Sequence, residues 1–546
     1  MNISTQVSKY FAAAADATAT GEAVPVTTTG NKVTPLIDGR RYFREIRNLL
    51  NSLGTGAAVS NQFFYMTGWW LHLTSGPGAT TTAPLAPGTG TPQSPTTRTG
   101  DTLPAFRLQD DRPGPHPLMA HLLATKAAAG VDVRVMGWVN PIILTKTVAN
   151  QVGGFWNVVA GTLLSIHHLR RYTIGASRPL AKRVCALTIG HALGAMHLKM
   201  VVARDSSKAK AFIGGIDFVS NRVAGNTHPG TENWHDMAVM IEGPAVMAFY
   251  DLFRSLWKEQ INRRPISRFR VGGRSIRSVE SGTTSVPART FPSSGTGKHY
   301  VQVARTLPQY RFSTIKPMYG AKALSFAPNG KFEVKVAWRK AIANASRYIY
   351  VEDQSFWSQE VMDWINARVK ANNNVKVILL IGARDPADPP NDGPLVEAIN
   401  NHLLAGLTAP QKARVGLFLR RNIIVHSKLT IIDDHWLFVG SANCMRRSLY
   451  TDGEMSVGVL DKNDKLATTV RVALWGEHFG KTPAQSAPLK NVTKALAVWK
   501  PAWGSSPPFS LPPARISVRP LPLPPATRPY NAGQYRLQDA DSRQTI

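Results

Sequence analysis

Residues 426–443 read HSKLTIIDDHWLFVGSAN, and residues 197–217 read HLKMVVARDSSKAKAFIGGID. Each stretch opens with a histidine and a lysine two positions apart, continues as an apolar run and ends at a glycine turn. Side chains two positions apart on a strand point to the same face, so each histidine projects beside its lysine. Two such stretches predict two copies of one structural unit, with a pocket where the copies meet.

The sequence around each stretch repeats as well. The first half has helical patterns at 40–53 and 116–130 and strand patterns at 61–71 and 131–138, and the second half has helical patterns at 336–346 and 358–373 and strand patterns at 347–357 and 375–383. Helices that alternate with strands in this way predict an α/β fold in which helices cover both faces of a sheet. We therefore expect two similar α-β-α sandwich lobes, related by a pseudo-twofold axis, with the active site at their interface.

The two His-x-Lys pairs suit the cleavage of a phosphodiester. Lys199 and Lys428 would neutralise the phosphoryl oxygens as charge develops on them. One of His197 and His426 can attack phosphorus and form a phosphohistidine, while the other protonates the leaving oxygen and then activates water or an alcohol. We expect neither a metal ion nor another cofactor, because the lysines supply the positive charge.

A histidine in either role is helped by a carboxylate that orients its second ring nitrogen. Each half offers one acid at a similar distance downstream of its His-x-Lys pair, Asp236 in ENWHDMAVMI and Glu454 in YTDGEMSVGV. Each acid stands at the head of a period-2 strand pattern. We expect both carboxylates to belong to the active site.

These residues resemble the phospholipase D superfamily, whose signature is H-x-K-x4-D followed by a Gly-Gly or Gly-Ser turn. The second copy fits in full, at His426, Lys428, Asp433, Gly440, Ser441 and Asn443. The first copy fits in part, at His197, Lys199, Gly214, Gly215 and Asp217. Arg222 after GGID, WHD at 234–236 and IYVEDQSFW at 349–357 are similar to the eukaryotic-type branch, including its bacterial members.

The resemblance implies hydrolysis of a phospholipid headgroup ester to phosphatidic acid, or transfer of the phosphatidyl group to an alcohol. It implies that His197 is the nucleophile and that His426 is the general acid and base. Implied phosphate ligands are Lys199, Lys428, Ser441 and Asn443, and implied structural positions are Asp433, Asp205, Asp217, Gly214, Gly215 and Gly440.

The first copy departs from the signature. Arg204 stands where the aspartate belongs, and Asp205 follows one residue later. A slip of one residue reverses the strand face, so Asp205 cannot substitute unless a bulge restores the phase. In the second copy Met445 replaces an asparagine that is common after GSAN. Because the aspartate is expected to be structural, we expect activity to survive its displacement.

The chain is strongly basic. Lys and Arg number 64 against 34 Asp and Glu, a net charge of +30, and such a surface favours anionic partners. We expect a phospholipid membrane surface, preferably anionic, with water or a small alcohol as acceptor. Two alternatives stay open, a phosphodiesterase acting on nucleic acid and a non-catalytic protein that binds phosphate or anionic lipid. We see no aromatic-basic stacking platform, and so expect no stable nucleic-acid partner. We also expect the protein to be a monomer.

A chain of 546 residues is too long for one core. We predict an N-terminal extension at 1–34, a first half at 35–262 with a low-complexity insertion at 75–115, a basic flexible connector at 263–297, a second half at 298–500 and a proline-rich tail at 501–546.

The remaining features concern the compartment. Two cysteines, Cys185 and Cys444, form neither a disulfide framework nor a zinc motif. The uncharged stretch at 147–169 is interpreted as a buried helix or a flap beside the site rather than a membrane-touching segment. For Trp69, Trp70 and Trp156 core packing is favoured over membrane contact. Without a signal peptide or a membrane span, we expect a cytoplasmic protein or an effector exported by a route that needs no signal.

Overall fold

The computed structural model describes residues 2–56, 58–74, 106–140, 154–191, 194–228, 234–263, 268–271, 274–309, 323–381, 398–420, 423–463, 465–499 and 518–520. The predicted tail lies outside these residues except for 518–520, and the predicted insertion lies outside them except for its end. There Phe106 and Leu108 are buried in the core of the first half. The insertion therefore ends before residue 106 rather than at 115.

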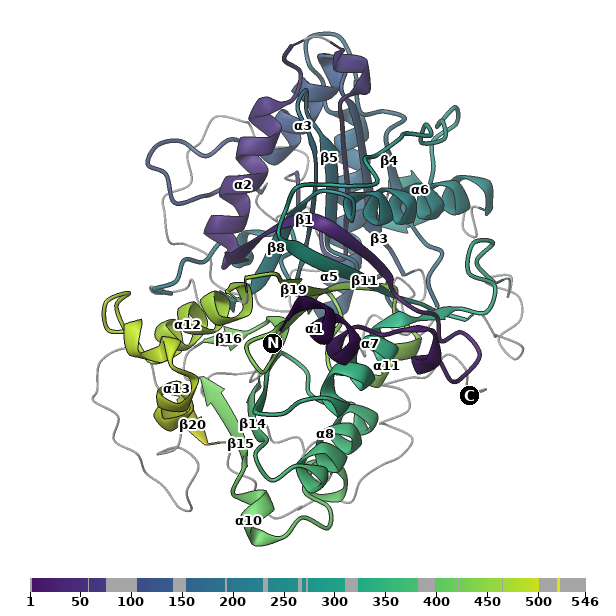
Figure 1. Ribbon diagram of the computed structural model, residues 1–546. Helices are drawn as coiled ribbons and strands as arrows, with labels where there is room; N and C mark the ends of the chain where they lie inside the picture. The colour runs from purple at the N-terminus through teal and green to yellow at the C-terminus, as the bar shows by residue number, and fades with distance from the viewer. Residues whose placement is uncertain are drawn as a thin grey trace.

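One mixed β-sheet runs through both halves of the chain (Figure 1). From edge to edge its strands are β20 (Val518–Pro520), β15 (Val415–Arg420), β14 (Lys376–Ile381), β13 (Tyr348–Asp353), β17 (Lys428–Ile432), β18 (Trp436–Gly440), β19 (Glu454–Asp461), β11 (His299–Leu307), β1 (Val26–Ile37), β8 (Met237–Glu242), β6 (Ala209–Gly214), β5 (Met200–Arg204), β2 (Phe63–Gly68), β3 (Asp132–Trp138) and β4 (Val184–Leu187). The short strand β12 (Lys331–Phe332) pairs with β11, and two small sheets join β9 (Arg268–Val271) to β10 (Arg274–Arg277) and β7 (Trp234–His235) to β16 (Ile424–Val425).

The order of the strands confirms the predicted α/β fold with two similar halves. Outward from the central pair β1 and β11, the strands β8, β6, β5, β2, β3 and β4 of the first half match β19, β18, β17, β13, β14 and β15 of the second. In both halves the strand after the first helix runs parallel to the next strand and antiparallel to the strand that follows a His-x-Lys pair. The two sheets are joined through β1 and β11, so the pseudo-twofold axis passes through one continuous sheet.

Helices cover this sheet, and those of the predicted repeat are present with ends shifted by a few residues. The described α-helices are α1 (Ile3–Tyr10), α2 (Gly39–Ser52), α3 (Met119–Ala128), α5 (Gly154–Arg171), α6 (Val246–Arg263), α7 (Glu333–Ala343), α8 (Gln359–Ala371), α10 (Ala409–Lys412), α11 (Arg446–Tyr450), α12 (Leu466–His478) and α13 (Val492–Trp499). Strands β2, β13, β17 and β18 are buried along their whole length, so both sheet faces are covered beside the site.

The N-terminal residues belong to the core, contrary to the predicted extension at 1–34. Strand β1 pairs with β11 at Val26 to Thr28 and with β8 from Lys32 onward, and it thereby joins the two halves. Helix α1 lies beside α7 of the second half (Figure 1), where Tyr10 and Phe11 are buried. Threonine and valine favour extended backbone, but the surrounding Ala- and Thr-rich composition concealed this strand in the sequence.

The predicted flexible connector at 263–297 is also packed where the structure describes it. Arginines alternate with apolar residues in β9 and β10, and Phe269 and Ile276 are buried in the core of the first half. The Thr284 carbonyl accepts hydrogen bonds from Trp257 Nε1 at 2.9 Å and Arg134 Nη1 at 2.6 Å. This segment is therefore an ordered part of the first half.

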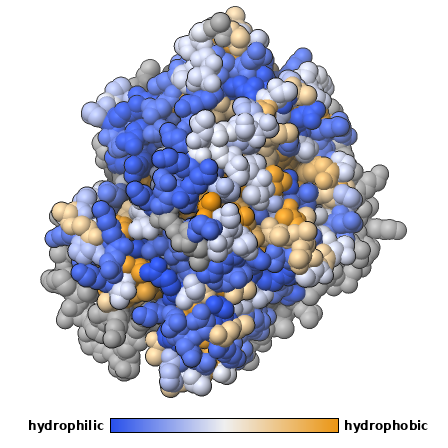
Figure 2. All heavy atoms as spheres, in the orientation of Figure 1, coloured by the Kyte–Doolittle hydropathy of each residue, from blue (hydrophilic) through white to orange (hydrophobic). Residues whose placement is uncertain are grey.

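The described surface gives no sign of a membrane span. Helix α5 buries Val158, Leu163 and Leu169, which confirms the predicted buried helix for its described part. None of the described helices combines the length and the apolar character needed to cross a bilayer. The face drawn in Figure 2 is mostly hydrophilic, with small hydrophobic patches near its middle.

Candidate active site

The segment ahead of each His-x-Lys pair lies against the other half of the chain. The residue before His426 pairs with His235 in the parallel β7–β16 sheet. The residue before His197 pairs with Gly453, again in the parallel sense. Each His-x-Lys pair is thereby placed beside the strand head that carries the acid of the other half.

Each histidine takes its orienting carboxylate from the opposite half. His197 Nδ1 lies 3.1 Å from Glu454 Oε1, and His426 Nδ1 lies 2.7 Å from Asp236 Oδ2. Both predicted acids are therefore in the site, but they are exchanged between the halves, a pairing that the sequence left open. Neither half holds a complete His–carboxylate pair by itself.

The contacts of His197 and His426 distinguish the two nitrogens of each ring. His197 Nδ1 also lies 3.0 Å from the carbonyl oxygen of Ser441, which can only accept a hydrogen bond. Nδ1 must therefore carry a proton, and the lone pair of Nε2 stays available. Asp236 also faces Nδ1 of His426, so Nε2 is the nitrogen turned away from the carboxylate in both rings.

The two His-x-Lys pairs share one buried environment. Burial, followed by the charges of Lys199 and Lys428, holds the pKa of His197 well below its usual range. Burial, followed by the charges of Lys428, Arg222 and Lys199, does the same to the pKa of His426. The lysine of each half therefore lowers the pKa of the histidine in the other half, and both imidazoles are neutral near pH 7.

The orienting acids are perturbed in the opposite direction. Burial raises the pKa of Asp236 to about 7 and the pKa of Glu454 to about 8. A carboxyl group and an imidazole that are buried together hold one proton between them more readily than two separate charges. Each pair can therefore take up or release a proton near neutral pH, as general acid–base catalysis requires.

The two lysines supply positive charge beside the histidines. Lys199 Nζ lies 3.5 Å from Asp217 Oδ2 and 5.1 Å from the ring centre of Trp69. Lys428 Nζ lies 3.5 Å from Gln354 Oε1, and burial lowers its pKa to about 8. Each ammonium group donates to the carbonyl of the histidine two residues earlier. This local bond holds the charge where a phosphate could meet it.

Ser441, Asn443 and Ser448, which follow the second glycine turn, differ in their hydrogen bonds. Ser441 Oγ donates to Glu454 Oε2 at 2.5 Å, so it positions the acid, whereas the sequence predicted a phosphate contact. Ser448, which was not predicted as a site residue, donates to Glu454 Oε1 at 2.8 Å. Within the described chain, Asn443 Oδ1 is buried without a hydrogen-bond partner. Because Oδ1 is an acceptor, any contact of Asn443 with a phosphate oxygen would have to come from its Nδ2 amide group.

The glycines of the two turns permit close approach. A Cβ atom on Gly215 would overlap the carboxylate of Asp236, and a Cβ on Gly214 or Gly440 would overlap the backbone of the neighbouring strand. Asp236 could not reach His426 past a larger residue. The structural role predicted for these glycines thus agrees with the packing.

Aromatic side chains flank both histidines. Trp69 packs edge-on at 5.3 Å from His197, and Trp234 packs edge-on at 5.1 Å from His426. The buried guanidinium of Arg222 lies 3.5 Å from the ring centre of Trp234. Trp69 packs against the core, as the sequence predicted, and each tryptophan also lies against one histidine of the site.

Asp433, the aspartate of the complete motif, has a structural role. Its carboxylate accepts hydrogen bonds from the backbone N–H groups of Ser346, Arg347 and Tyr348 at 2.7, 2.7 and 2.9 Å. It also accepts one from the Tyr10 hydroxyl at 2.7 Å. Asp433 therefore fixes the start of β13 and ties helix α1 to the second half.

The shifted aspartate of the first motif performs a smaller version of this task. Asp205 accepts from the backbone N–H of Lys208 at 2.9 Å in the β5–β6 turn, and from Ser52 Oγ at 3.1 Å at the end of α2. Arg204 instead lies 4.5 Å from the ring centre of Phe291. Asp205 thus keeps backbone hydrogen bonds within its own turn, from Ser207 and Lys208, and its contact with the preceding helix is the single hydroxyl bond from Ser52.

This difference predicts unequal effects on stability. Asp433→Ala would leave three backbone N–H groups without their acceptor and is expected to cost about 3 kcal/mol or more, whereas Asp205→Ala is expected to cost about 1–2 kcal/mol. Thermal unfolding of the two variants should show the larger loss of Tm for Asp433→Ala. Activity per folded molecule should stay within about twofold of the parent. Equal losses of Tm would contradict the assignment.

Comparisons with known proteins find a family model, curated relatives and a solved structure that are similar to this chain. The family model described as "Cardiolipin synthase, PLD-like domain" matches residues 338–475. Phospholipase D alpha 4 of Arabidopsis thaliana is 22% identical over 468 residues, covering 66% of this chain and 58% of that protein. Cardiolipin synthase 1 of Staphylococcus aureus (strain COL) is 30% identical over 142 residues, covering 26% of each. The crystal structure of phosphatidylserine synthase from Haemophilus influenzae Rd KW20 aligns with a TM-score of 0.43 and 10% identity, covering 86% of this chain and 93% of that one. The chain spans less than two thirds of the length of the curated relatives it matches.

Proposed function

Because the chain belongs to the phospholipase D superfamily of phosphodiesterases, we propose that it hydrolyses the headgroup ester of glycerophospholipids to phosphatidic acid. The observation that carries the proposal is the exchange of carboxylates between the two halves, which provides two oriented imidazoles and two buried ammonium groups. A protein that only binds phosphate has use for the lysines but little use for two histidines with separate orienting acids. The geometry therefore favours catalysis over binding.

The proposed reaction has two steps. His197 Nε2 attacks phosphorus, the bond to the headgroup oxygen breaks, and His426 gives its Nε2 proton to that oxygen. His426 then removes a proton from water or an alcohol, which attacks the phosphohistidine and frees His197. Lys199, Lys428 and the Asn443 amide hold the phosphoryl oxygens and stabilise the charge that develops on them. The assignment of His197 as nucleophile rests on the resemblance of the motifs.

Phospholipid is the favoured substrate class for two reasons. The relatives are named for phospholipases D and cardiolipin synthases. The net charge of +30 would draw the chain to an anionic membrane surface. Transfer of the phosphatidyl group to an alcohol follows from the same intermediate.

The test offers both kinds of phosphodiester to the full-length chain. Vesicles of phosphatidylcholine and phosphatidylglycerol are incubated with and without ethanol and with a chelator, in parallel with DNA and RNA. We expect phosphatidic acid, and phosphatidylethanol when ethanol is present, with turnover that persists during the assay in chelator. His402→Ala is the matched control, because His402 forms an exposed His–carboxylate pair with Asp363 outside the site. Nucleotide fragments without phosphatidic acid would exclude the lipid substrate.

The raised pKa of Asp236 predicts the alkaline limb of the pH profile. The His426–Asp236 pair must hold a proton to protonate the leaving oxygen, and it loses that proton as the pH rises through about 7. The neutral form of His197 persists well below pH 6.5 because its pKa is lowered. We expect kcat/KM to be level at mildly acidic pH and then to fall about tenfold per unit of pH above neutrality. A profile that stays level into the alkaline range would contradict the assignment.

A further inference from the structure

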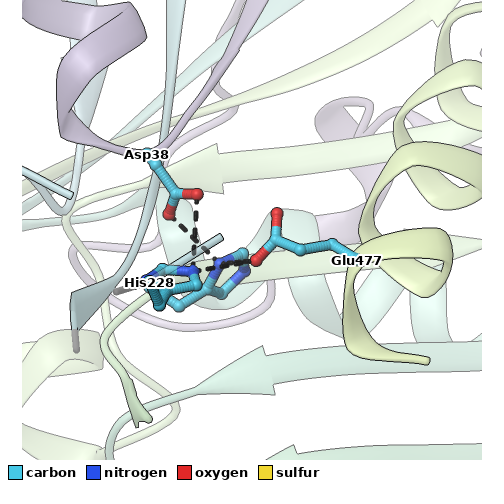
Figure 3. Close-up of side chains that lie close together, drawn as sticks. Asp38, His228 and Glu477 are labelled. Atoms are coloured by element: carbon cyan, nitrogen blue, oxygen red, sulfur yellow. Dashed lines mark hydrogen bonds and ion pairs between the residues drawn. The ribbon is translucent and has the colours of Figure 1, made fainter. Parts of the chain in front are cut away.

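A second cluster of histidines and acids is buried beside the active site (Figure 3). It consists of Asp38, His228 and His235 from the first half and Glu477 from the second, with each residue offering one donor atom and all four donors within 4.8 Å of one another. We propose that these four residues bind a single divalent transition-metal ion of the zinc class. The site would clamp the two halves together without taking part in the reaction.

The spacing of the donors matches a four-coordinate ion. His228 Nε2 lies 3.0 Å from Glu477 Oε1 and 3.6 Å from Asp38 Oδ2. His235 Nδ1 lies 2.9 Å from Glu477 Oε1 and 3.2 Å from Asp38 Oδ1. Ligands bound tetrahedrally at the usual Zn–N and Zn–O distances are separated by about 3.4 Å. Small movements of these side chains would therefore complete the coordination.

Two of the donor atoms lie in ion pairs but form no well-directed hydrogen bond. Within the described part of the chain, neither His235 Nδ1 nor Asp38 Oδ2 completes a well-directed hydrogen bond. His235 is 0% exposed and Asp38 is 1% exposed, so solvent does not compensate for the missing bonds. Buried ion pairs that lack good hydrogen-bond geometry stabilise weakly, and a metal ion would coordinate both atoms directly.

The far side of His235 is arranged as it is in metal-binding histidines. His235 Nε2 lies 3.2 Å from Glu352 Oε2, opposite the nitrogen that faces the proposed ion. Glu352 Oε1 in turn contacts His478 Nε2 at 2.5 Å and accepts from the Tyr350 hydroxyl. A carboxylate on the second nitrogen of a metal-bound histidine fixes its tautomer and raises its basicity.

The charges of the cluster also favour a divalent cation. Asp38, Glu477 and Glu352 contribute three negative charges, and Arg420, whose Nη1 lies 2.9 Å from Glu477 Oε1, contributes one positive charge. Burial lowers the pKa of His235, but Glu477, Asp38 and Glu352 outweigh burial and hold this pKa well above its usual range, so His235 carries a proton and one net negative charge is left. A metal ion would displace this proton and leave two negative charges around a divalent cation. Two imidazoles and two carboxylates suit zinc, whereas calcium and magnesium prefer six or more oxygen ligands.

The cluster is connected to the active site through the backbone. Asp38 N donates to the Asp236 carbonyl at 2.9 Å, and Asp236 N donates to Asp38 Oδ1 at 3.2 Å. His426 N donates to the His235 carbonyl at 2.7 Å. A metal ion held by Asp38 and His235 would thus fix the segment that carries Asp236 against the segment that carries His426.

The test measures zinc binding by the full-length chain after prolonged dialysis against chelator. Zinc is titrated calorimetrically, the Tm is measured with and without zinc, and cobalt is titrated in a parallel sample. We expect one zinc ion per chain, a rise in Tm of about 2 °C or more, and visible cobalt absorption of the strength typical of four-coordinate ions. None of these three readouts depends on turnover.

Variants then assign the binding to this cluster. Glu477→Gln, which keeps the shape of the side chain, and His228→Ala should each weaken zinc binding at least tenfold and remove the rise in Tm. His402→Ala should bind zinc as the parent does. Wild-type protein that binds no zinc and shows no shift in Tm would leave the cluster an ion-pair network and overturn the proposal. Unchanged zinc binding in Glu477→Gln would overturn it as well.

Discussion

Alanine at His197 or at His426 is expected to reduce turnover of a natural phospholipid by about 10⁴-fold or more. The two substitutions remove different chemistry, because Nε2 of His197 is the proposed nucleophile and Nε2 of His426 the proposed proton donor. Loss of either group blocks the reaction, so the double variant should be little worse than either single variant. Phosphatidic acid release from vesicles measures the effect, with His402→Ala as control.

A substrate with a good leaving group separates the two roles. A nitrophenyl phosphodiester needs little protonation of its leaving oxygen, so His426→Ala should still release a burst of nitrophenol and accumulate phosphorylated protein. His197→Ala should give neither a burst nor a phosphorylated chain. The reverse result would exchange the two roles, and full activity in either alanine variant would refute the paired mechanism.

Much of the fold could be predicted from local pattern. The helices and strands of the repeat have strong apolar periodicity, and α2, β2, α3 and β3 lie within a few residues of their predicted positions. Strand β1 was missed because its sequence, VTTTGNKVTPLI, looks like a polar extension until its two partner strands are known. Pairing with β8 and β11 depends on contacts between residues more than 200 positions apart, which no local window contains.

In the active site too, residues in local motifs could be predicted, whereas contacts between distant residues could not. The histidines, lysines and acids could be predicted, because each lies in a short motif that occurs twice. Their pairing could not, because His197 and Glu454 are brought together only when the two halves fold against each other. Trp234 lies in the WHD match and Ser448 follows GSAN, but the sequence indicates no contact for either; Ser448 contacts Glu454 and Trp234 contacts His426 only in the fold. The cluster around His235 could not be predicted for the same reason, since Asp38 and Glu477 are far in sequence from His228 and His235.

Because the orienting acids are exchanged between the halves, we expect substitution of either acid to reduce turnover strongly. Asp236→Asn and Glu454→Gln keep the size of each side chain but remove the charge that stabilises an imidazolium and selects its tautomer. Each substitution is expected to lower kcat by about 10²- to 10⁴-fold. Ser441→Ala, which removes one hydrogen bond to Glu454, should cost about 10-fold.

The two acid variants should fail at different steps, because the acids are crossed. Glu454→Gln disables His197, so the burst of nitrophenol should be slow even with a good leaving group. Asp236→Asn disables His426, so the burst should be nearly as fast as in the parent, followed by slow release of the phosphorylated form. Uncrossed pairs, in which each acid served the histidine of its own half, would give the opposite assignment. A burst that is fast in Glu454→Gln and slow in Asp236→Asn would therefore contradict the exchange on which the proposed mechanism rests.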